Sequence, residues 1–320
     1  MKVIDLHCDT LLKLNKEGNL KNAKGMITLD GLKKGQVAVQ CFADFVPTGI
    51  FPKRIRTIAS ERMFQTLYKR YLAMMERYPD ELLPILSSED IQRAEREQKI
   101  GVLLTIEDGG VIGDKLENLK KFYNMGVRLV TLTWNHPNFI GYPNSSDPNL
   151  MKLGLTDFGR SAVREMERLG IIVDISHVSD GVFYDVAEIA EKPFIASHSN
   201  SRAVCGHPRN MSDEMIRILA DKGGIMGLNL CPVFLKEGSR ESRVEEMVSH
   251  ILHIRNTGGS EVLALGSDFD GITGDLEIKG PQDWELLYHA LKKKGMTERE
   301  LEQMWYGNAR RVITELLNAD

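Results

Sequence analysis

The chain has 320 residues and a formal net charge of −4, from 41 basic and 45 acidic side chains. Because the two signs are well mixed, the composition indicates neither a nucleic-acid partner nor an anionic membrane surface. Four scattered cysteines without a Cys-x-x-Cys spacing favour free thiols in a reducing compartment. No signal-peptide pattern and no stretch of transmembrane length is present, so we expect a cytoplasmic protein with no membrane partner.

Strand-like and helix-like stretches alternate along the chain. The predicted strands are short and mostly apolar, and they cover residues 3–9, 37–43, 101–106, 127–134, 171–177, 193–198, 224–230 and 262–268. Helical patterns lie between them, with a long amphipathic helix at about 54–77, others starting near 88, 116, 156, 179, 212 and 244, and two closing helices over 282–294 and 298–317. The connection over 135–156 is long enough to suggest a functional loop.

Eight short strands separated by helices predict an α/β fold, a (β/α)8 TIM barrel forming a single domain over residues 1–320. A doubly wound open sheet is the alternative. No Gly-x-Gly-x-x-Gly follows the first strand, so a dinucleotide site is not indicated.

Imidazole and carboxylate side chains stand at the ends of the predicted strands. His7 and Asp9 share one face of the first strand, because side chains alternate along a strand. The other strand-end residues of this kind are Glu107, His177, His198 and Asp268. In a barrel these ends meet at one mouth, where active sites lie. Each residue alone has an ordinary structural explanation, but one metal centre explains all of them together.

The residue types narrow the metal. Imidazole and carboxylate without thiolate suit zinc or another borderline metal. Six convergent groups exceed the three protein ligands of a typical mononuclear catalytic zinc site, so two ions bridged by a carboxylate fit better. Among other polar residues, Asp5 is expected to form buried hydrogen bonds and Asp270 to support Asp268, whereas His250 and His253 are expected to be packing or surface residues.

Several short motifs occur in order along nearly the whole chain. They are Asp5-Leu6-His7-Cys8-Asp9, Ile106-Glu107-Asp108-Gly109-Gly110, Ile175-Ser176-His177-Val178-Ser179, Ala196-Ser197-His198-Ser199, Arg209-Asn210 and Gly266-Ser267-Asp268-Phe269-Asp270-Gly271. Together they resemble the motifs of the membrane (renal) dipeptidase family, which belongs to the amidohydrolase-type metal barrels. The resemblance implies two zinc ions per chain, and it implies a dipeptide substrate, often with a D-residue at the second position.

The resemblance also implies a ligand set. His7 and Asp9 would hold one zinc ion, His177 and His198 the other, and Glu107 would bridge the two. A hydroxide between the ions would then attack the peptide carbonyl. On the family alone, we expect a homodimer.

Two further roles follow from the same resemblance. Asp268 would take the proton and pass it to the leaving amine, and Arg209 would hold the C-terminal carboxylate of the substrate.

One position departs from the family pattern. The family has a substrate-polarising histidine at the end of strand four, where this chain has Trp134, and His136 is the candidate to replace it from the loop. Two alternatives to a dipeptidase stay open. One is another binuclear amidohydrolase acting on a cyclic amide, an ester or a phosphoester, although Glu107 at strand three disfavours it. The other is a catalytically inactive peptide-binding barrel, which the intact set of candidate ligands disfavours.

Overall fold

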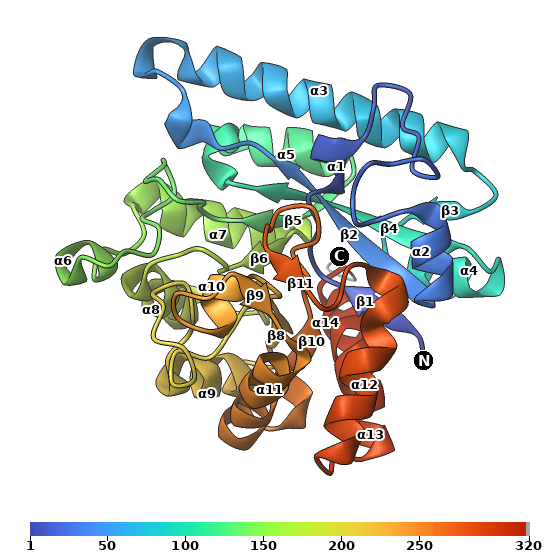
Figure 1. Ribbon diagram of the computed structural model, residues 1–320. Coiled ribbons are helices and arrows are strands. Elements are labelled where there is room, and N and C mark those ends of the chain that lie inside the picture. The colour runs from blue at the N-terminus through green and yellow to red at the C-terminus, as the bar shows by residue number, and fades with distance from the viewer. Residues whose placement is uncertain (318–320) are drawn as a thin grey trace.

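Residues 1–317, which the computed structural model describes, fold into a closed barrel of eight parallel strands ringed by helices (Figure 1). The barrel strands are β1 (Val3–Asp5), β2 (Val37–Phe45), β4 (Ile100–Glu107), β5 (Val127–Thr131), β6 (Ile172–Asp174), β7 (Ile195–Ser199), β8 (Ile225–Leu228) and β10 (Leu263–Leu265). The ring closes where β1 pairs with β10, with Asp5 opposite Leu265. This closure confirms the predicted barrel and excludes the open sheet. The last three residues of the predicted domain, 318–320, lie outside the described residues.

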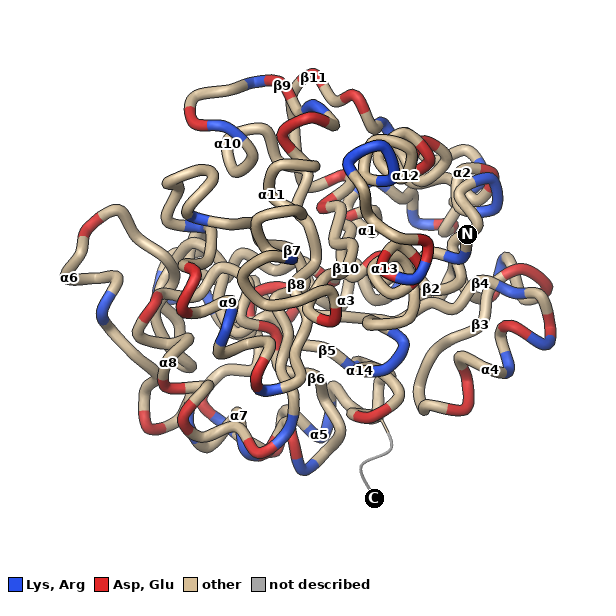
Figure 2. The backbone as a smooth tube through the Cα atoms, turned by 90° about the horizontal axis from the view of Figure 1, so that it is seen from below, with Lys and Arg blue, Asp and Glu red and all other residues tan. Residues whose placement is uncertain are grey.

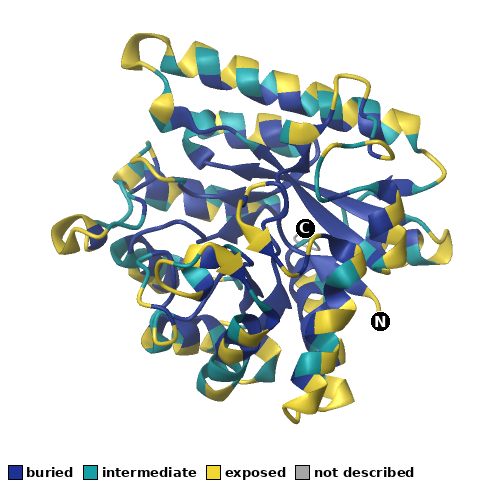
Figure 3. Cartoon of the chain, in the orientation of Figure 1, coloured by how far each residue is buried: buried dark blue, intermediate teal, exposed yellow. Residues whose placement is uncertain are grey.

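Helices cover the outside of the barrel, and their outward faces are exposed while their inward faces are buried (Figure 3). They are α1 (Thr10–Lys13), α2 (Leu29–Lys34), α3 (Arg56–Arg77), α4 (Ser88–Arg96), α5 (Glu117–Asn124), α6 (Pro148–Met151), α7 (Asp157–Leu169), α8 (Asp180–Ile189), α9 (Asp213–Asp221), α10 (Pro232–Leu235), α11 (Val244–Gly258), α12 (Trp284–Lys293), α13 (Glu298–Glu302) and α14 (Asn308–Leu317). Thr156, Ser179 and Ser212 each cap a helix by accepting a backbone N–H with the side-chain oxygen. These are the starts that the sequence predicts.

The strands differ from the prediction in three places. The sequence did not predict strand β3 (Leu82–Pro84). It pairs with the first residues of β4, and β5 pairs with later residues along the same edge of β4. It is too short to show a period, and its proline suits an edge strand. The ladder of β1 ends at Asp5, because residues 7–9 turn into the barrel mouth and only Cys8 still bridges, to Phe269. A two-stranded sheet of β9 (Glu241–Ser242) and β11 (Asp275–Leu276) was also not predicted.

The barrel interior is a packed apolar layer, with one residue from every barrel strand. These residues are Ile4, Val39, Leu103, Leu129, Ile172, Ile195, Ile225 and Ala264. Helix α14 packs against this layer through Val312, Ile313 and other apolar side chains. Asn308, at the start of α14, donates to the carbonyl of Leu263, the first residue of β10. The helix therefore closes the amino end of the barrel, and the carboxyl ends of the strands are left to form the mouth.

The predicted closing helix over 298–317 is interrupted. A π-helical turn, Gln303–Gly307, lies between α13 and α14.

Charged residues of both signs are interspersed over the outer helices (Figure 2). Within residues 1–317, no helix combines the length and apolarity that crossing a bilayer would require.

Candidate metal centre

The strand ends bring the six predicted residues together at the carboxyl end of the barrel. Glu107 ends β4, His198 lies in β7, and the other four follow their strands by two to four residues. All six are buried, with exposed fractions between 0% for His198 and 9% for His177 and Asp268. Ionisable groups buried this deeply need partners or a bound ion, since an isolated buried charge is costly.

Glu107 lies between two sets of imidazoles. Its Oε1 is 3.0 Å from Nε2 of His177 and 3.8 Å from Nε2 of His198. Its Oε2 is 3.5 Å from Nε2 of His7. Each carboxylate oxygen therefore faces a different part of the cluster, as a carboxylate that bridges two cations must do.

The ligand atoms form two overlapping groups. Those of His7, Glu107 and His198 lie within 4.8 Å of one another, and so do those of His7, Asp9 and Asp268. These groups share His7 rather than following the predicted pairing of His177 with His198, although Nε2 of His177 and Nε2 of His198 are only 3.1 Å apart. How the ligands divide between two ions stays a prediction.

The donors fit a metal. Both ring nitrogens of His7 and Oδ1 of Asp9 are buried with no hydrogen-bond partner among the described residues. Buried polar atoms are seldom left unsatisfied in folded proteins, and a cation held by imidazole and carboxylate would satisfy these. The described members of the cluster include no thiol, which favours a borderline metal such as zinc over a soft one.

The pKa shifts within the cluster also favour a bound cation. Burial, with the nearby charge of Asp9, raises the pKa of Glu107, and burial is also the main cause of the raised pKa of Asp268. Burial opposes a charge on His7, but Glu107 and Asp9 outweigh it and raise the pKa of His7 well above the usual range. Burial lowers the pKa of His198 well below its usual range. A bound cation would relieve the repulsion among the carboxylates and would find a neutral imidazole ready to bind it.

The backbone is strained around this cluster. His177 and Asp268 have φ values of 69° and 63°, in the left-handed region that residues with a side chain seldom adopt. Asp108 and Asp270, next to the cluster in sequence, are also left-handed, with φ values of 73° and 70°. Such strain concentrates at functional sites, where surrounding contacts hold it in place.

Asp270 fixes its own turn through two contacts. It accepts from Thr10 Oγ1 and from the backbone N–H of Met26, both at 2.6 Å. Neither contact reaches Asp268, so the predicted support of Asp268 stays a prediction.

Arg209 lies against the strand end that carries His198. It is 5% exposed, and it donates from Nη2 to the carbonyl of His198 and from Nη1 to Ser199 Oγ, both at 3.1 Å. Its Nε has no partner among the described residues. The guanidinium is 5.5 Å from the ring of Phe234, and it is close enough to Asp268 and Glu107 for their charges to act on its pKa. A cation is therefore held beside the cluster.

Comparison with known proteins identifies the family. The sequence profile of the membrane dipeptidase family, peptidase family M19, matches residues 1–319. The chain belongs to this family. An uncharacterized dipeptidase of Schizosaccharomyces pombe is 30% identical over 97% of the chain and 79% of its own length. Dipeptidase 3 of Mus musculus is 30% identical over 93% of the chain, which spans 59% of the mouse protein.

Solved structures support the same assignment. A metallopeptidase dipeptidase of family M19 superposes with a TM-score of 0.91 at 25% identity, covering 100% of this chain and 99% of that one. A metallopeptidase from Rhodobacter sphaeroides, solved with a phosphinate mimic of the dipeptide L-Ala-D-Ala, has a TM-score of 0.89 at 25% identity, with 98% of both chains covered. The resemblance predicted from the motifs is confirmed, and membership of this family makes the chain a metal-dependent peptidase.

At the position where the resemblance implies a histidine, Trp134 is half-buried and meets Phe45 edge-on, with ring centroids 5.0 Å apart. His136 is exposed, lies 6.0 Å from the Trp134 ring, and packs so closely on Gly49 that a Cβ there would fall 2.1 Å from the His136 Cβ. No contact found among the described residues joins His136 to the six clustered residues. Its predicted substrate role stays a prediction.

Two asparagines that the sequence analysis missed contact the cluster. Asn135 Oδ1 lies 3.2 Å from His177 Nδ1, and Asn229 Nδ2 donates to Asp268 Oδ2 at 3.0 Å. Both follow the ends of barrel strands, as four of the six clustered residues do. Searching strand ends for amides as well as for ionisable residues would have found them.

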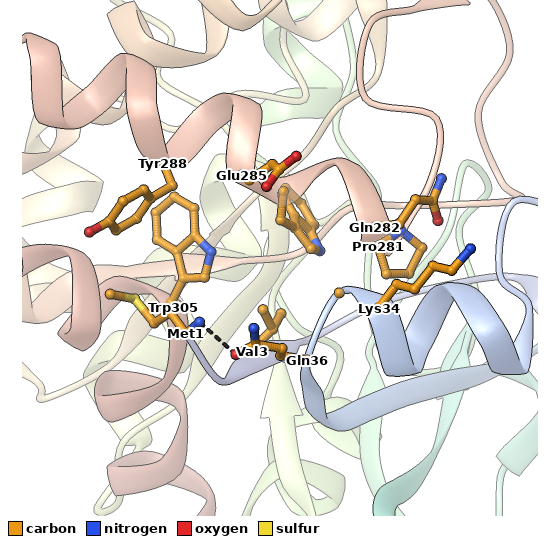
Figure 4. A pocket seen from close by; sticks show the side chains of 11 residues that line it. Met1, Val3, Lys34, Gln36, Pro281, Gln282, Glu285, Tyr288 and Trp305 are labelled. Atoms are coloured by element: carbon orange, nitrogen blue, oxygen red, sulfur yellow. Dashed lines mark hydrogen bonds between the residues drawn. The ribbon is translucent and has the colours of Figure 1, made fainter.

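A separate pocket of about 400 Å³ opens at the other end of the barrel (Figure 4). Val3, at the start of β1, and Gln36, just before β2, line it together with residues of α12. Its charged side chains, Lys34 and Glu285, have opposite signs, and none of the six clustered residues contributes to it. This pocket is therefore distinct from the candidate metal centre.

Proposed function

We propose that the chain is a zinc dipeptidase that hydrolyses the peptide bond of a free dipeptide at the cluster around Glu107. The observation that carries the proposal is that Glu107 faces His177 with one oxygen, at 3.0 Å, and His7 with the other, at 3.5 Å. A carboxylate in this position suits a site for two metal ions. Family membership and the dipeptide mimic bound to the Rhodobacter sphaeroides relative support the substrate class.

In this proposal His7 and Asp9 would hold one zinc ion, His177 and His198 would hold the other, and Glu107 would contribute to both sites. The unpartnered buried atoms of His7 and Asp9 support this assignment. When bound, the two ions would polarise the peptide carbonyl and lower the pKa of a water molecule toward about 7.

Asp268 moves the proton. Asn229 engages its Oδ2 at 3.0 Å, which leaves Oδ1 turned toward the cluster, 3.9 Å from His7 Nε2. Asp268 takes a proton from water as the new carbon–oxygen bond forms. It returns the proton to the amide nitrogen as the carbon–nitrogen bond breaks, so the elements of water are added across the peptide bond.

Arg209 selects the substrate. Its guanidinium matches the planar geometry of the free C-terminal carboxylate of a dipeptide. Because this cation is fixed against the His198 strand end, a continuing peptide chain would leave it unpaired. The L-Ala-D-Ala mimic bound by the relative supports acceptance of a D-residue at the second position.

The test is turnover of a substrate panel by protein of measured metal content. L-Ala-L-Ala and L-Ala-D-Ala should be cleaved by protein that carries about two equivalents of zinc, and chelation should abolish cleavage. Tripeptides and dipeptide amides should be poor substrates. Cleavage of a cyclic amide or an ester with no cleavage of any dipeptide would refute the proposal in favour of another amidohydrolase activity. Zinc-loaded protein that cleaves nothing on the panel would refute it in favour of a binding barrel.

Three further properties belong to the same proposal. Residues 1–320 form one catalytic domain, the enzyme works in the cytoplasm, and it forms a homodimer. Four free cysteines support a reducing compartment. Light scattering of the purified protein measures the oligomeric state.

A further inference from the structure

A buried aspartate ties the ends of two neighbouring strands together beside the cluster. Oδ1 of Asp174 accepts the backbone N–H groups of Ser176 and Ser197, at 3.0 and 2.8 Å. Oδ2 accepts the hydroxyls of Ser197 and Thr131, both at 2.6 Å. Four donors thus converge on one fully buried carboxylate, which acts as an acceptor in every contact.

The Ser197 hydroxyl has two further partners, and one of them is Oγ of Ser176 at 3.2 Å, which accepts the backbone N–H of His198. The other is Nδ1 of the next residue, His198, which lies 2.6 Å from the Ser197 oxygen. A hydroxyl has one proton to donate, and Asp174 can only accept it. The Ser197 oxygen must therefore accept from His198, which places the imidazole proton on Nδ1.

We propose that Asp174 and Ser197 are positioning residues that hold His198 in the tautomer protonated on Nδ1, and so keep a lone pair on its Nε2 directed into the cluster. There Nε2 of His198 lies 3.1 Å from Nε2 of His177 and 3.8 Å from Oε1 of Glu107. Histidines that bind metals commonly donate their other N–H to a carboxylate or carbonyl, and here a serine hydroxyl carries that contact to the carboxylate.

A second aspartate, Asp5, also links the ends of two neighbouring strands, and it does so without a contact to an imidazole. Oδ1 of Asp5 accepts from the backbone N–H groups of His7 and Ser267, at 3.4 and 2.8 Å, and Oδ2 accepts the Ser267 hydroxyl at 2.6 Å. The other contacts of that hydroxyl are the carbonyl of His7 and the N–H of Phe269, both at 3.1 Å. The same arrangement therefore occurs without a ring nitrogen, and the link from Ser197 to His198 is an added feature.

Nuclear magnetic resonance of the metal-free protein tests the tautomer directly. Histidine labelled with ¹⁵N gives long-range ¹H–¹⁵N patterns that distinguish the two tautomers, and the His198→Gln variant assigns the signal. We expect the Nδ1–H form in the parent. In Asp174→Asn the amide oxygen must face the two backbone N–H groups, so its NH₂ faces Ser197 and turns that hydroxyl proton away from residue 174, toward His198 Nδ1 or Ser176 Oγ. We expect the share of the Nε2–H form to rise in this variant.

Zinc affinity tests the consequence, using two matched variants. Ser197→Ala and Thr131→Val each remove one hydroxyl donor from the same oxygen of Asp174, but only Ser197 contacts His198. Competition with a chromophoric chelator should show affinity about 10–100-fold weaker for Ser197→Ala, the usual cost of losing a residue that orients a metal ligand. In Thr131→Val the zinc affinity should fall by less than about threefold, whereas the loss of thermal stability should be similar to that in Ser197→Ala.

The outcomes separate this inference from the proposed metal centre, on which its functional meaning rests. Finding the Nε2–H form in the parent, or equal affinity losses in the two variants, would overturn it. If the parent binds no zinc, the proposed function fails, while the tautomers of the parent and of Asp174→Asn still decide the inference.

Discussion

Asn229 holds one oxygen of Asp268, donating from Nδ2 to Oδ2 at 3.0 Å. Asn229 is itself fixed, because its Oδ1 accepts the N–H of Cys231 at 2.6 Å and its own N–H donates to Asn200 at 3.0 Å. The carboxylate of Asp268, on a backbone with φ of 63°, can therefore present only Oδ1 to a substrate. The orientation of the Asp268 carboxylate, the proposed proton carrier, therefore depends on the side-chain amide of Asn229, which is not one of the proposed metal ligands.

Asn229→Ala should lower kcat by about tenfold or more with zinc content unchanged. Hydrogen bonds to charged groups contribute about 1.5–3 kcal/mol, and about 1.4 kcal/mol corresponds to a factor of ten in rate. Asn118→Ala is the matched control, because it removes a 2.7 Å side-chain hydrogen bond to the carbonyl of Ile112, away from the cluster. Equal kcat losses in the two variants would mean that Asn229 only stabilises the fold.

Glu107→Ala should lose both zinc ions or nearly all of the second. A carboxylate that faces His177 and His7 with different oxygens serves two sites, so its removal leaves both short of a ligand. Metal analysis after gel filtration is the measurement, with Glu188→Ala as the control, since the side chain of Glu188 is 71% exposed. Two equivalents bound as tightly as in the parent would rule out the bridging position.

Asp268→Asn should keep its zinc and lose about 10²–10⁴-fold in kcat, the usual contribution of a general acid–base group. The amide has nearly the same shape as the carboxylate, but it cannot accept the proton. Steady-state kinetics on L-Ala-L-Ala, with metal content measured in the same sample, provide the check. A loss below about tenfold would assign the proton to another group, with His136 the next candidate.

Stability should fall in acid partly because of His250, which is buried with both ring nitrogens bonded. Nδ1 accepts the N–H of Ser201 at 3.1 Å and Nε2 donates to the carbonyl of Leu235 at 2.9 Å. Burial lowers the pKa of His250 to about 4, and the nearby His253 adds to this effect against the opposing carbonyl of Leu235 and charge of Glu246. The unfolded chain has a pKa of about 6.5 at this residue. Between these values only the unfolded chain binds the proton, so the free energy of unfolding decreases as pH falls through this window.

His250→Gln should therefore flatten the dependence of unfolding free energy on pH between about 6.5 and 4, by on the order of 3 kcal/mol. Urea unfolding of metal-free protein at several pH values measures the slope, and His289→Gln, at an exposed histidine, is the control. The prediction is wrong if the His250 variant retains the slope of the parent.

The metal-ligand candidates could be found from sequence because the carboxyl ends of all the strands in a closed parallel barrel lie together at one mouth. His7, Glu107 and His198 are separated by about a hundred residues each along the chain, yet their ligand atoms lie within 4.8 Å. The number of strands and the residue type at each strand end were enough to predict that these side chains lie close together.

The orientation of the side chains could not be predicted in the same way. His177 and Asp268 have left-handed backbones, which no periodicity in the sequence indicates. Asn135 and Asn229 contact the cluster from just beyond strand ends, but their amide side chains are not among the ionisable types from which the metal centre was predicted. The sequence also suggested His136 as a replacement for the missing histidine, without showing that its ring packs on Gly49.

Arg209 gives the sharpest test of substrate selection, because its effect should depend on one functional group of the substrate. The buried guanidinium is held by Ser199 and the carbonyl of His198, with Nε left unpaired. Truncating one partner of a buried charge pair costs about 2–5 kcal/mol, so Arg209→Ala should lose about thirty- to several-thousand-fold in kcat/KM on a free dipeptide.

The same variant should lose little on the matching dipeptide amide, which lacks the carboxylate and should already be a poor substrate for the parent. The ratio of free-acid to amide kcat/KM should therefore collapse in Arg209→Ala. The exposed Arg217→Ala controls for loss of a surface charge and should keep the ratio of the parent. If kcat/KM falls equally for the free acid and the amide, the damage lies in the loop or in the candidate metal ligands, since Arg209 also supports the backbone of His198. The carboxylate would then be recognised by another group.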